Sequence, residues 1–209
     1  MAISLKQTRK IIFLDKDGTL VENVPYNVDP AKIRLTQGAA SGLCKLAAHG
    51  YAFVVISNQC GVAKGFFTEA ALVPVKAYLQ RLFAGLGAEL LGFYYCPHHP
   101  DGERAGYAYR CTCRKPAPGL LHQAALAHDV DLGRSWMIGD ILDDVEAGRR
   151  AGCLTLLLDN GHETEWRSGP FRTPDLIARD LSVAADCIVA ATHLQRQHEP
   201  PLDLRQSRQ

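Results

Sequence analysis

Five short apolar segments of this chain are each followed by a stretch with the length and pattern of a helix or an ordered loop. The apolar segments are 11–14, 51–56, 90–95, 135–138 and 154–158, and the helical ones are 38–49, 68–84, 118–128 and 143–151. Short apolar runs of this kind are typical of strands buried on both faces of a sheet. Strands that alternate with helices predict right-handed βαβ units. The predicted fold class is therefore α/β, with a doubly wound parallel sheet.

The length of the chain is that of one domain. With 209 residues it can bury a core of ordinary size, and we expect a single domain at 1–192 followed by a flexible tail at 193–209. Within the domain we expect a surface loop at 160–174, a helix at 175–181 and a last edge strand at 186–189. We expect the protein to be a monomer.

The charge and the N-terminal sequence exclude several classes of protein. The formal net charge is +1 at pH 7, which argues against a nucleic-acid-binding surface. The first apolar run, IIFL, is too short for a signal-peptide core or a membrane span. We therefore expect a cytoplasmic protein that has neither a nucleic acid nor a membrane as its partner.

Polar residues gather where the predicted strands end. Ligands of an open α/β sheet bind beyond the carboxyl ends of the strands. The residues expected there are Asp15, Asp17, Thr19, Ser57, Asn58, Arg114, Lys115, Asp140, Asp143 and Asp144. Asp15 and Asp17 alone could simply cap a turn before Gly18. The convergence of polar residues from four separate parts of the chain favours a functional site instead.

The residue types in this group indicate a class of chemistry. Carboxylates that crowd together repel one another unless a cation lies between them, and Mg²⁺ suits one or two carboxylates with substrate oxygens. A lysine and small polar groups suit a phosphoryl group, whose transfer needs positioning and charge neutralisation. A carboxylate can also act as the nucleophile and form an aspartyl phosphate. The group therefore predicts magnesium-dependent phosphoryl transfer.

Four sequence motifs resemble those of the haloacid dehalogenase superfamily. They are FLDKDGTL at 13–20, SNQ at 57–59, RKP at 114–116 and GDILDD at 139–144. Their order and spacing match that superfamily from about residue 11 to residue 158. The resemblance implies a phosphatase with the fold predicted above and without a large cap domain.

The resemblance also implies catalytic and metal-binding roles. Asp15 would be the nucleophile and a magnesium ligand. Asp17 would be the general acid and base, and would also reach the metal. Lys115 would balance charge between Asp15 and the phosphoryl group, and Asp140 would complete the magnesium site.

The remaining motif residues are implied to contact the substrate or to support the metal ligands. Thr19 and Ser57 match substrate-binding positions, and Ser57 would hydrogen-bond the transferred phosphoryl group. Asn58 would orient the substrate. Either Asp143 or Asp144 would lie behind the metal ligands.

The segment 96–113 carries a separate cluster of potential metal ligands. Cys96 and His98 form one pair, Cys111 and Cys113 form the other, and each pair has one intervening residue. Three thiolates and one imidazole make a closed tetrahedral zinc set of the structural kind. His99 is the less well matched neighbour of His98. The competing interpretation is a disulfide or an accidental grouping, but a lasting disulfide is disfavoured in a cytosolic protein.

This zinc loop narrows the resemblance to one group within the superfamily. The pattern CPHHP…CTCRKP, on a chain without a large cap, resembles the heptose bisphosphate phosphatases, with the histidinol-phosphate phosphatases as relatives. The group implies a small phosphorylated sugar as substrate and Arg114 as the residue that selects it. An arginine fixed beside the site could bind a second phosphate through two hydrogen bonds. The chain departs from the group at Ile141, where those enzymes often carry a lysine. It also departs at 161–174, a segment that contains His162 and Glu163 and is longer than expected. A solvated surface loop is the favoured interpretation of this segment, and an extra rim over the pocket is the alternative.

Three other functions are weighed against this one. Histidinol phosphate or another sugar phosphate could be the substrate. A polynucleotide 3′-phosphatase shares the early motifs, but the near-neutral charge and the lack of a GxxxxGK[ST] motif count against a repair enzyme. A non-catalytic, zinc-stabilised interaction module would be favoured by loss of Asp15, Asp17, Lys115 or Asp140, and all four are present.

Overall fold

The computed structural model of the chain describes residues 8–198, with side chains up to 194, and contains a six-stranded sheet in the order β3-β2-β1-β4-β5-β6. All neighbouring strands pair in parallel. The strands are β1 (Ile11–Leu14), β2 (Ala52–Asn58), β3 (Leu90–Cys96), β4 (Trp136–Gly139), β5 (Leu154–Leu158) and β6 (Leu176–Ala178). The predicted α/β fold class is confirmed. The chain reverses its direction of winding between β1 and β4, where the ligand crevice of such a sheet lies.

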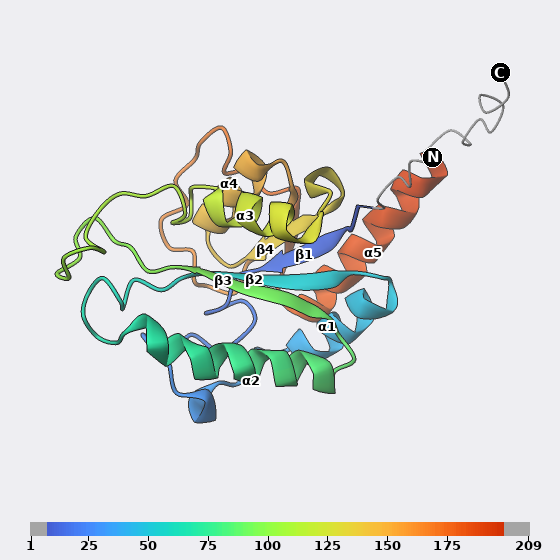
Figure 1. The fold of residues 1–209 in the computed structure, drawn as a ribbon. Coiled ribbons are helices and arrows are strands. Elements are labelled where there is room, and N and C mark those ends of the chain that lie inside the picture. The colour runs from blue at the N-terminus through green and yellow to red at the C-terminus, as the bar shows by residue number, and fades with distance from the viewer. Residues whose placement is uncertain (1–7, 199–209) are drawn as a thin grey trace, which may run out of the picture.

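Helices cover both faces of this sheet (Figure 1). The α-helices are α1 (Ala39–Ala48), α2 (Leu72–Gly85), α3 (Gly119–His128), α4 (Leu142–Ala151) and α5 (Leu181–His198). Three 3₁₀ turns are η1 (Pro30–Lys32), η2 (Glu69–Ala71) and η3 (Leu132–Arg134). Helices α1, α2 and α5 pack on one face, while α3 and α4 pack on the other. Because both faces are covered, the central strands are apolar without alternation.

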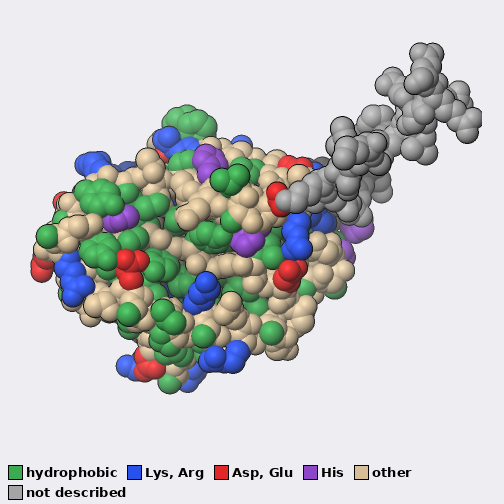
Figure 2. Space-filling model, viewed as in Figure 1, with side chains coloured by type: hydrophobic (Ala, Val, Ile, Leu, Met, Phe, Trp, Pro, Cys, Tyr) green, Lys and Arg blue, Asp and Glu red, His purple; other side chains and the backbone are tan. Residues whose placement is uncertain are grey.

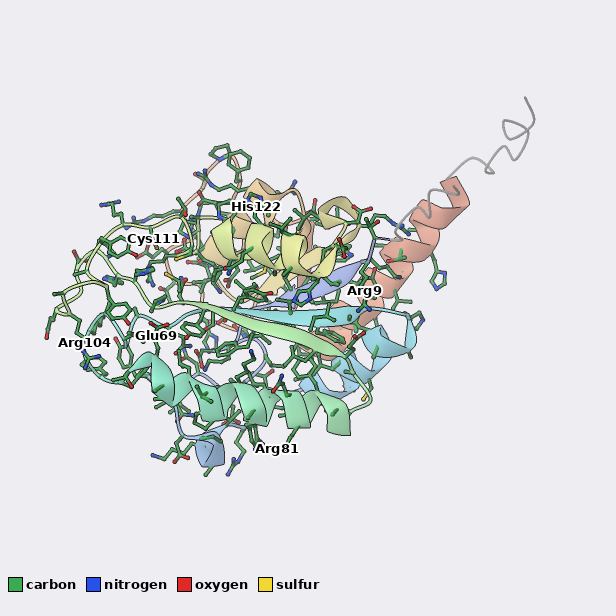
Figure 3. The ribbon with its side chains drawn as sticks, viewed as in Figure 1. Arg9, Glu69, Arg81, Arg104, Cys111 and His122 are labelled. Atoms are coloured by element: carbon green, nitrogen blue, oxygen red, sulfur yellow. The ribbon has the colours of Figure 1, made fainter. Side chains whose placement is uncertain are left out.

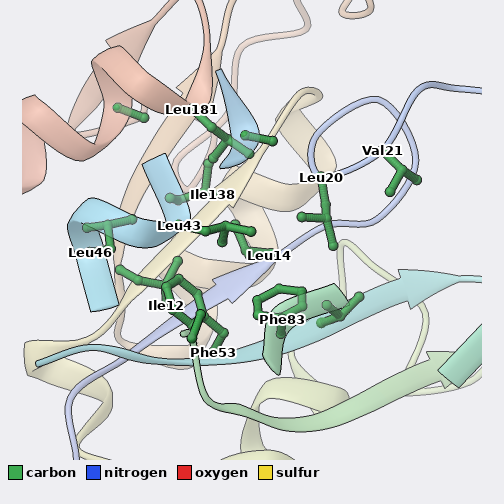
Figure 4. Packing of buried hydrophobic residues seen from close by; sticks show 14 of the residues in the cluster. Ile12, Leu14, Leu20, Val21, Leu43, Leu46, Phe53, Phe83, Ile138 and Leu181 are labelled. Atoms are coloured by element: carbon green, nitrogen blue, oxygen red, sulfur yellow. The ribbon is translucent and has the colours of Figure 1, made fainter. Parts of the chain in front are cut away.

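The alternating side chains of β1 supply the two halves of the core. Ile12 and Leu14 point to the α1–α2–α5 layer, where they meet Phe53 and Phe83 (Figure 4). Ile11 and Phe13 point to the α3–α4 layer. All four residues of β1 are buried, so the strand that carries the first motif is held rigidly at the centre of the molecule.

The C-terminal part differs from the sequence prediction. The expected helix at 175–181 contains strand β6, and the expected strand at 186–189 lies inside α5. Short apolar runs do not distinguish helix from strand by their period. In α5, the buried residues Ala184, Ala185 and Ile188 share the helical face that packs on α1.

Two further predictions concern the C-terminal tail and the absence of a membrane span. Helix α5 continues through His198, so six residues of the expected tail are helical. The rest of that tail, 199–209, lies outside the described residues. Within 8–198, no helix is long and apolar enough to cross a membrane. On the face shown in Figure 2, basic side chains are scattered among acidic ones and form no continuous stripe.

The longest connection runs from β3 to α3 and projects beyond the carboxyl ends of the strands (Figure 1). Glu69 holds this loop to the sheet, since its carboxylate accepts hydrogen bonds from the hydroxyl groups of Tyr95 (2.9 Å) and Tyr107 (2.7 Å). Figure 3 shows Glu69 near the start of α2 and Cys111 in the part of the loop that approaches α3.

The crossing of α1 and α5 gives a test of this packing. A methyl group on Gly42 would lie 2.7 Å from the carbonyl carbon of Leu181, whereas nothing lies within 4 Å of one on Gly85. We expect Gly42→Ala to lower the free energy of unfolding by about 1–3 kcal/mol, because the two backbones must separate. We expect Gly85→Ala to be neutral or to stabilise by up to about 1 kcal/mol. Urea unfolding measures both, and equal effects would contradict the close helix crossing.

Candidate active site

Three buried carboxylates meet at the carboxyl ends of β1 and β4. Asp15 follows β1 and Asp140 follows β4, and the two ends are joined by a hydrogen bond from the Asp15 amide to the Ile138 carbonyl (3.0 Å). Asp144 reaches the same point from the first turn of α4. One oxygen of each of the three carboxylates lies within 4.8 Å of the others. A divalent cation fits such a group, because Mg²⁺ binds carboxylate oxygens.

Lys115 is the cation within this group. Its ammonium group bonds to Asp15 and to the Ile56 carbonyl (3.3 Å), and lies 2.5 Å from Asp144. Lys115 is only 2% exposed. Although burial acts in the opposite direction, the charges of Asp144 and Asp15 raise the pKa of Lys115. Lys115 is therefore a permanent positive charge beside Asp15.

The charges of the site do not balance by themselves. Four carboxylates, those of Asp15, Asp17, Asp140 and Asp144, face two ammonium groups, those of Lys115 and Lys16, which pairs with Asp17. Burial raises the pKa of Asp144 to about 8, and although Lys115 opposes this, the charges of Asp15 and Asp140 add to it. Such a shift is expected where negative charge is in excess. Two further positive charges, as on one Mg²⁺ ion, would neutralise the site.

Asp17 lies at the edge of this group and is partly open to solvent. Gln59 donates one hydrogen bond to Asp17 (3.2 Å) and another to the hydroxyl of Ser57 (2.8 Å). Burial raises the pKa of Asp17, the charge of Lys16 opposes this, and the charge of Asp15 adds to it. A raised pKa suits a carboxyl that gives and takes a proton.

Two residues predicted to bind substrate form hydrogen bonds with other residues of the site. Thr19 is fully buried (0% exposed) and donates a hydrogen bond to Asp140 (2.9 Å), so its hydroxyl does not face the solvent. Both polar atoms of the Asn58 side chain bond to the backbone of Lys115, at 3.1 and 3.2 Å. Asn58, at the end of β2, therefore holds in place the backbone of Lys115 at the end of the β3–α3 loop.

The choice between Asp143 and Asp144 is settled by their partners. Asp144 is buried within the carboxylate group. Asp143 faces outward and pairs with Arg172 at 2.9 Å. Of these two residues, only Asp144 therefore lies next to the carboxylates of Asp15 and Asp140.

Arg114 lies beside a cavity of about 570 Å³ that is also lined by Arg110 and Arg150. Its Nη1 atom is buried and has no hydrogen-bond partner among the described residues. A buried guanidinium nitrogen without a partner costs free energy, so an anionic ligand there would be stabilised. A second, smaller cavity of about 270 Å³ is lined by Asp17 and Asn58.

The four predicted zinc-ligand residues come together in the loop that precedes Arg114. The sulfur atoms of Cys96, Cys111 and Cys113 lie 3.2–3.4 Å apart, and His98 Nδ1 lies 3.3 Å from Cys113 Sγ. These distances exclude disulfides, whose sulfur atoms are about 2.05 Å apart. They are close to the ~3.8 Å edge of a tetrahedral site with metal–sulfur bonds of about 2.3 Å.

The contact of His98 Nε2 with another residue determines which ring nitrogen of His98 faces the thiols. His98 Nε2 contacts the Tyr109 hydroxyl at 2.7 Å, which leaves Nδ1 on the side of the sulfur atoms. His99 is turned away, because its Nδ1 accepts the backbone amide of Asp101 (3.1 Å). Burial raises the pKa of Cys96, which favours a neutral thiol unless a cation is bound.

Five residues at the site were not predicted from the sequence. Lys16 and Gln59 lie within the recognised motifs. Their positions next to residues with assigned roles could have indicated that they belong to the site. Asn160, His162 and Glu163 lie in the loop after β5, for which a solvated surface loop was favoured over a rim above the pocket. Asn160 donates to the Gly18 carbonyl (2.8 Å), and His162 Nδ1 lies 2.6 Å from Asp140 Oδ2.

Comparison with known proteins gives consistent matches. A family model described as HAD-hydrolase-like matches residues 112–184. A D-glycero-beta-D-manno-heptose-1,7-bisphosphate 7-phosphatase of Yersinia pestis is 36% identical over 154 residues, which are 74% of this chain and 82% of that protein. A D-glycero-alpha-D-manno-heptose-1,7-bisphosphate 7-phosphatase of Photorhabdus laumondii is 33% identical over 74% of this chain and 85% of that protein.

A solved structure with a similar fold is that of a D,D-heptose 1.7-bisphosphate phosphatase from B. bronchiseptica, complexed with magnesium and phosphate. It superposes with a TM-score of 0.73 at 31% identity, over 87% of this chain and 99% of that one. The similarity therefore covers most of this chain.

The buried ion pairs of Lys115 give a test of the charge arrangement. We expect Lys115→Met to lower the free energy of unfolding by about 3 kcal/mol or more, because Asp15 and Asp144 lose their buried counter-charge. Lys45 pairs with Asp186 at the exposed surface, so Lys45→Met is the matched control and should cost less than about 1 kcal/mol. Urea unfolding without added metal measures both. Equal losses would contradict the account.

Proposed function

Since this chain belongs to the haloacid dehalogenase-like (HAD-like) hydrolases, we propose that it is a magnesium-dependent phosphatase that removes the 7-phosphate of D-glycero-D-manno-heptose 1,7-bisphosphate. The observation that carries this proposal is the buried group of Asp15, Asp140, Asp144 and Lys115 at the point where the sheet reverses its winding. The choice of substrate is supported by the names of the relatives, and the reaction class is supported by the charges of the buried group.

The proposed reaction has two steps. The Asp15 carboxylate attacks phosphorus, and the bond from phosphorus to the sugar oxygen breaks while Asp17 gives that oxygen a proton. Asp17 then takes a proton from a water molecule, which attacks the phosphorus of the aspartyl phosphate and releases inorganic phosphate and free Asp15. The raised pKa of Asp17 suits this exchange of roles.

Lys115 and a Mg²⁺ ion held by the site would neutralise the charge of the transferred group. Asp15 and Asp140 would hold Mg²⁺ together with the backbone carbonyl of Asp17, and Asp144 would support them from behind. When bound, Mg²⁺ supplies positive charge to the phosphoryl oxygens. Lys115 donates a hydrogen bond to Asp15 and so orients the nucleophile.

Arg114 is proposed to bind the second phosphate of the substrate. Its Nη1 atom has no partner among the described residues, and Arg114 lines a cavity together with two other arginines and three acidic residues. Ile141 cannot provide the cation that related enzymes often place after the metal-binding aspartate. Arg114 therefore has the larger share in the recognition of a bisphosphate. The 1-phosphate of the heptose is the group that it would bind.

A panel of phosphate esters tests the reaction and the substrate together. The panel contains both anomers of the heptose bisphosphate, the matching 7-monophosphate, histidinol phosphate and other sugar phosphates, and phosphate release is measured with magnesium. We expect heptose bisphosphate to have the highest kcat/KM. Asp15→Asn should lower kcat by about a thousandfold or more, because the nucleophile is lost. A folded, metal-loaded protein that releases no phosphate from any ester would contradict the function.

The same panel tests Arg114 separately. Arg114→Ala should lower kcat/KM for the bisphosphate by about tenfold to a hundredfold, because hydrogen bonds to charged groups are lost. It should leave the 7-monophosphate almost unaffected. Arg104→Ala in the exposed part of the same loop is the control and should change neither value. Equal losses on both esters would show that Arg114 does not select the second phosphate.

We further propose a structural zinc ion held by Cys96, His98, Cys111 and Cys113. The loop has few apolar side chains, and a closed metal site would replace the core that it lacks. Since Arg114 and Lys115 directly follow Cys113, the ion would also fix the position of both cations.

Zinc content tests this site independently of activity. We expect Cys113→Ser to lose most of the bound zinc and to make the segment 97–113 sensitive to proteases, because the loop loses its cross-link. Cys187→Ser changes a thiol in α5 and serves as the control. Elemental analysis and limited proteolysis measure the two effects. Wild-type protein that is resistant to proteases without any zinc would contradict the proposal.

A further inference from the structure

The loop after β5 makes contacts with both metal-site segments. We refer to residues 160–172 as the clasp. Asn160 at its start donates to the Gly18 carbonyl (2.8 Å), beside the first motif. Arg172 at its end bonds to Asp143 (2.9 Å) and Glu146 (2.7 Å) on α4. The clasp is therefore fixed to the turn after β1 and to the helix after β4.

Glu163 of the clasp completes the N-terminus of α4. A helix leaves its first amide groups without partners, and the residue before it normally supplies a side-chain oxygen. Ile141 stands in that place and has no such oxygen. Glu163 Oε2 accepts the Leu142 amide instead (2.6 Å), while its other oxygen accepts the amides of Glu165 (2.8 Å) and Trp166 (3.2 Å). A negative charge at a helix N-terminus is also favourable.

His162 of the clasp contacts Asp140 directly. Asp140 Oδ1 accepts a hydrogen bond from Thr19 (2.9 Å), and Oδ2 lies 2.6 Å from His162 Nδ1. A carboxylate has about four acceptor sites, so both oxygens keep a free direction for a cation. The two contacts together hold the plane of the carboxylate.

Gly18 leaves the space in which this contact is made. A methyl group on Gly18 would lie 2.6 Å from His162 Nδ1 and would also overlap Asp140. The backbone at Gly18 has φ = 91°, which disfavours any other residue. The first motif, the clasp and Asp140 are thus packed directly on one another.

We propose that His162 and Glu163 are positioning residues for Asp140. His162 orients the carboxylate of Asp140. Glu163 fixes the backbone just after Asp140 by accepting the Leu142 amide, which the side chain of Ile141 cannot do. The inference rests on the proposed function, because Asp140 matters in this way only as a metal ligand. Residues behind metal ligands commonly contribute tenfold to a hundredfold to metal affinity.

Calorimetric titration of the free protein with Mg²⁺ tests the proposal without substrate. We expect His162→Ala to weaken Mg²⁺ binding by about tenfold. His162→Asn places an amide nitrogen near the position of Nδ1 and should restore most of the affinity. Glu163→Ala should also weaken binding, whereas Glu165→Ala and His122→Ala, which change exposed side chains away from Asp140, should not.

The outcomes separate this inference from the proposed function. Wild-type affinity in His162→Ala and Glu163→Ala, in a protein that binds Mg²⁺ and hydrolyses the ester, would overturn the positioning role alone. Equal weakening in His162→Ala and His162→Asn would also overturn it, since a general loss of packing does not depend on a donor at Nδ1. Wild-type protein that binds no Mg²⁺ would overturn both proposals.

Discussion

The ion pairs of Lys115 with Asp15 and Asp144 are the interactions on which the rest of the site depends. Charged groups are expensive to bury, and they are tolerated only when they are paired and hydrogen-bonded. The parallel sheet brings the ends of β1 and β4 together, and Asn58 holds the backbone of Lys115 against them. The remaining excess of negative charge would favour a divalent cation, and that cation together with Lys115 would attract a phosphoryl group.

Two loops, one after β3 and one after β5, support this centre. The β3–α3 loop carries the cysteine and histidine cluster and leads directly into Arg114 and Lys115. The clasp at 160–172 supports Asp140 and the start of α4. The site therefore needs no second domain to position its charged groups, and the variable loops surround a rigid strand end.

Much of this arrangement follows from the sequence. Parallel strands end at one edge of the sheet, so Asp15, Lys115 and Asp140 were expected to meet once the alternation of strands and helices was recognised. The paired spacing of the cysteines likewise predicted their cluster. The burial of Thr19 and its hydrogen bond to Asp140 could not be predicted, because a sequence does not show which polar side chain turns inward.

The parts that were missed depend on contacts between distant segments. The clasp has no helical or strand period, and its contacts to Gly18, Asp140 and Leu142 span about 20 residues or more. The strand and helix at 176–198 were misplaced because packing against β5 and α1 determines them, and local pattern does not.

The most direct test of the central claim is chemical trapping of the intermediate. Acid quenching during turnover, followed by borohydride reduction and peptide mass spectrometry, identifies the carboxylate that carried the phosphoryl group. The account predicts that Asp15 is converted to homoserine, and that the product is absent without substrate. Modification of Asp17 or Asp140 instead, or of no carboxylate while phosphate is being released, would contradict the assignment of Asp15 as the nucleophile.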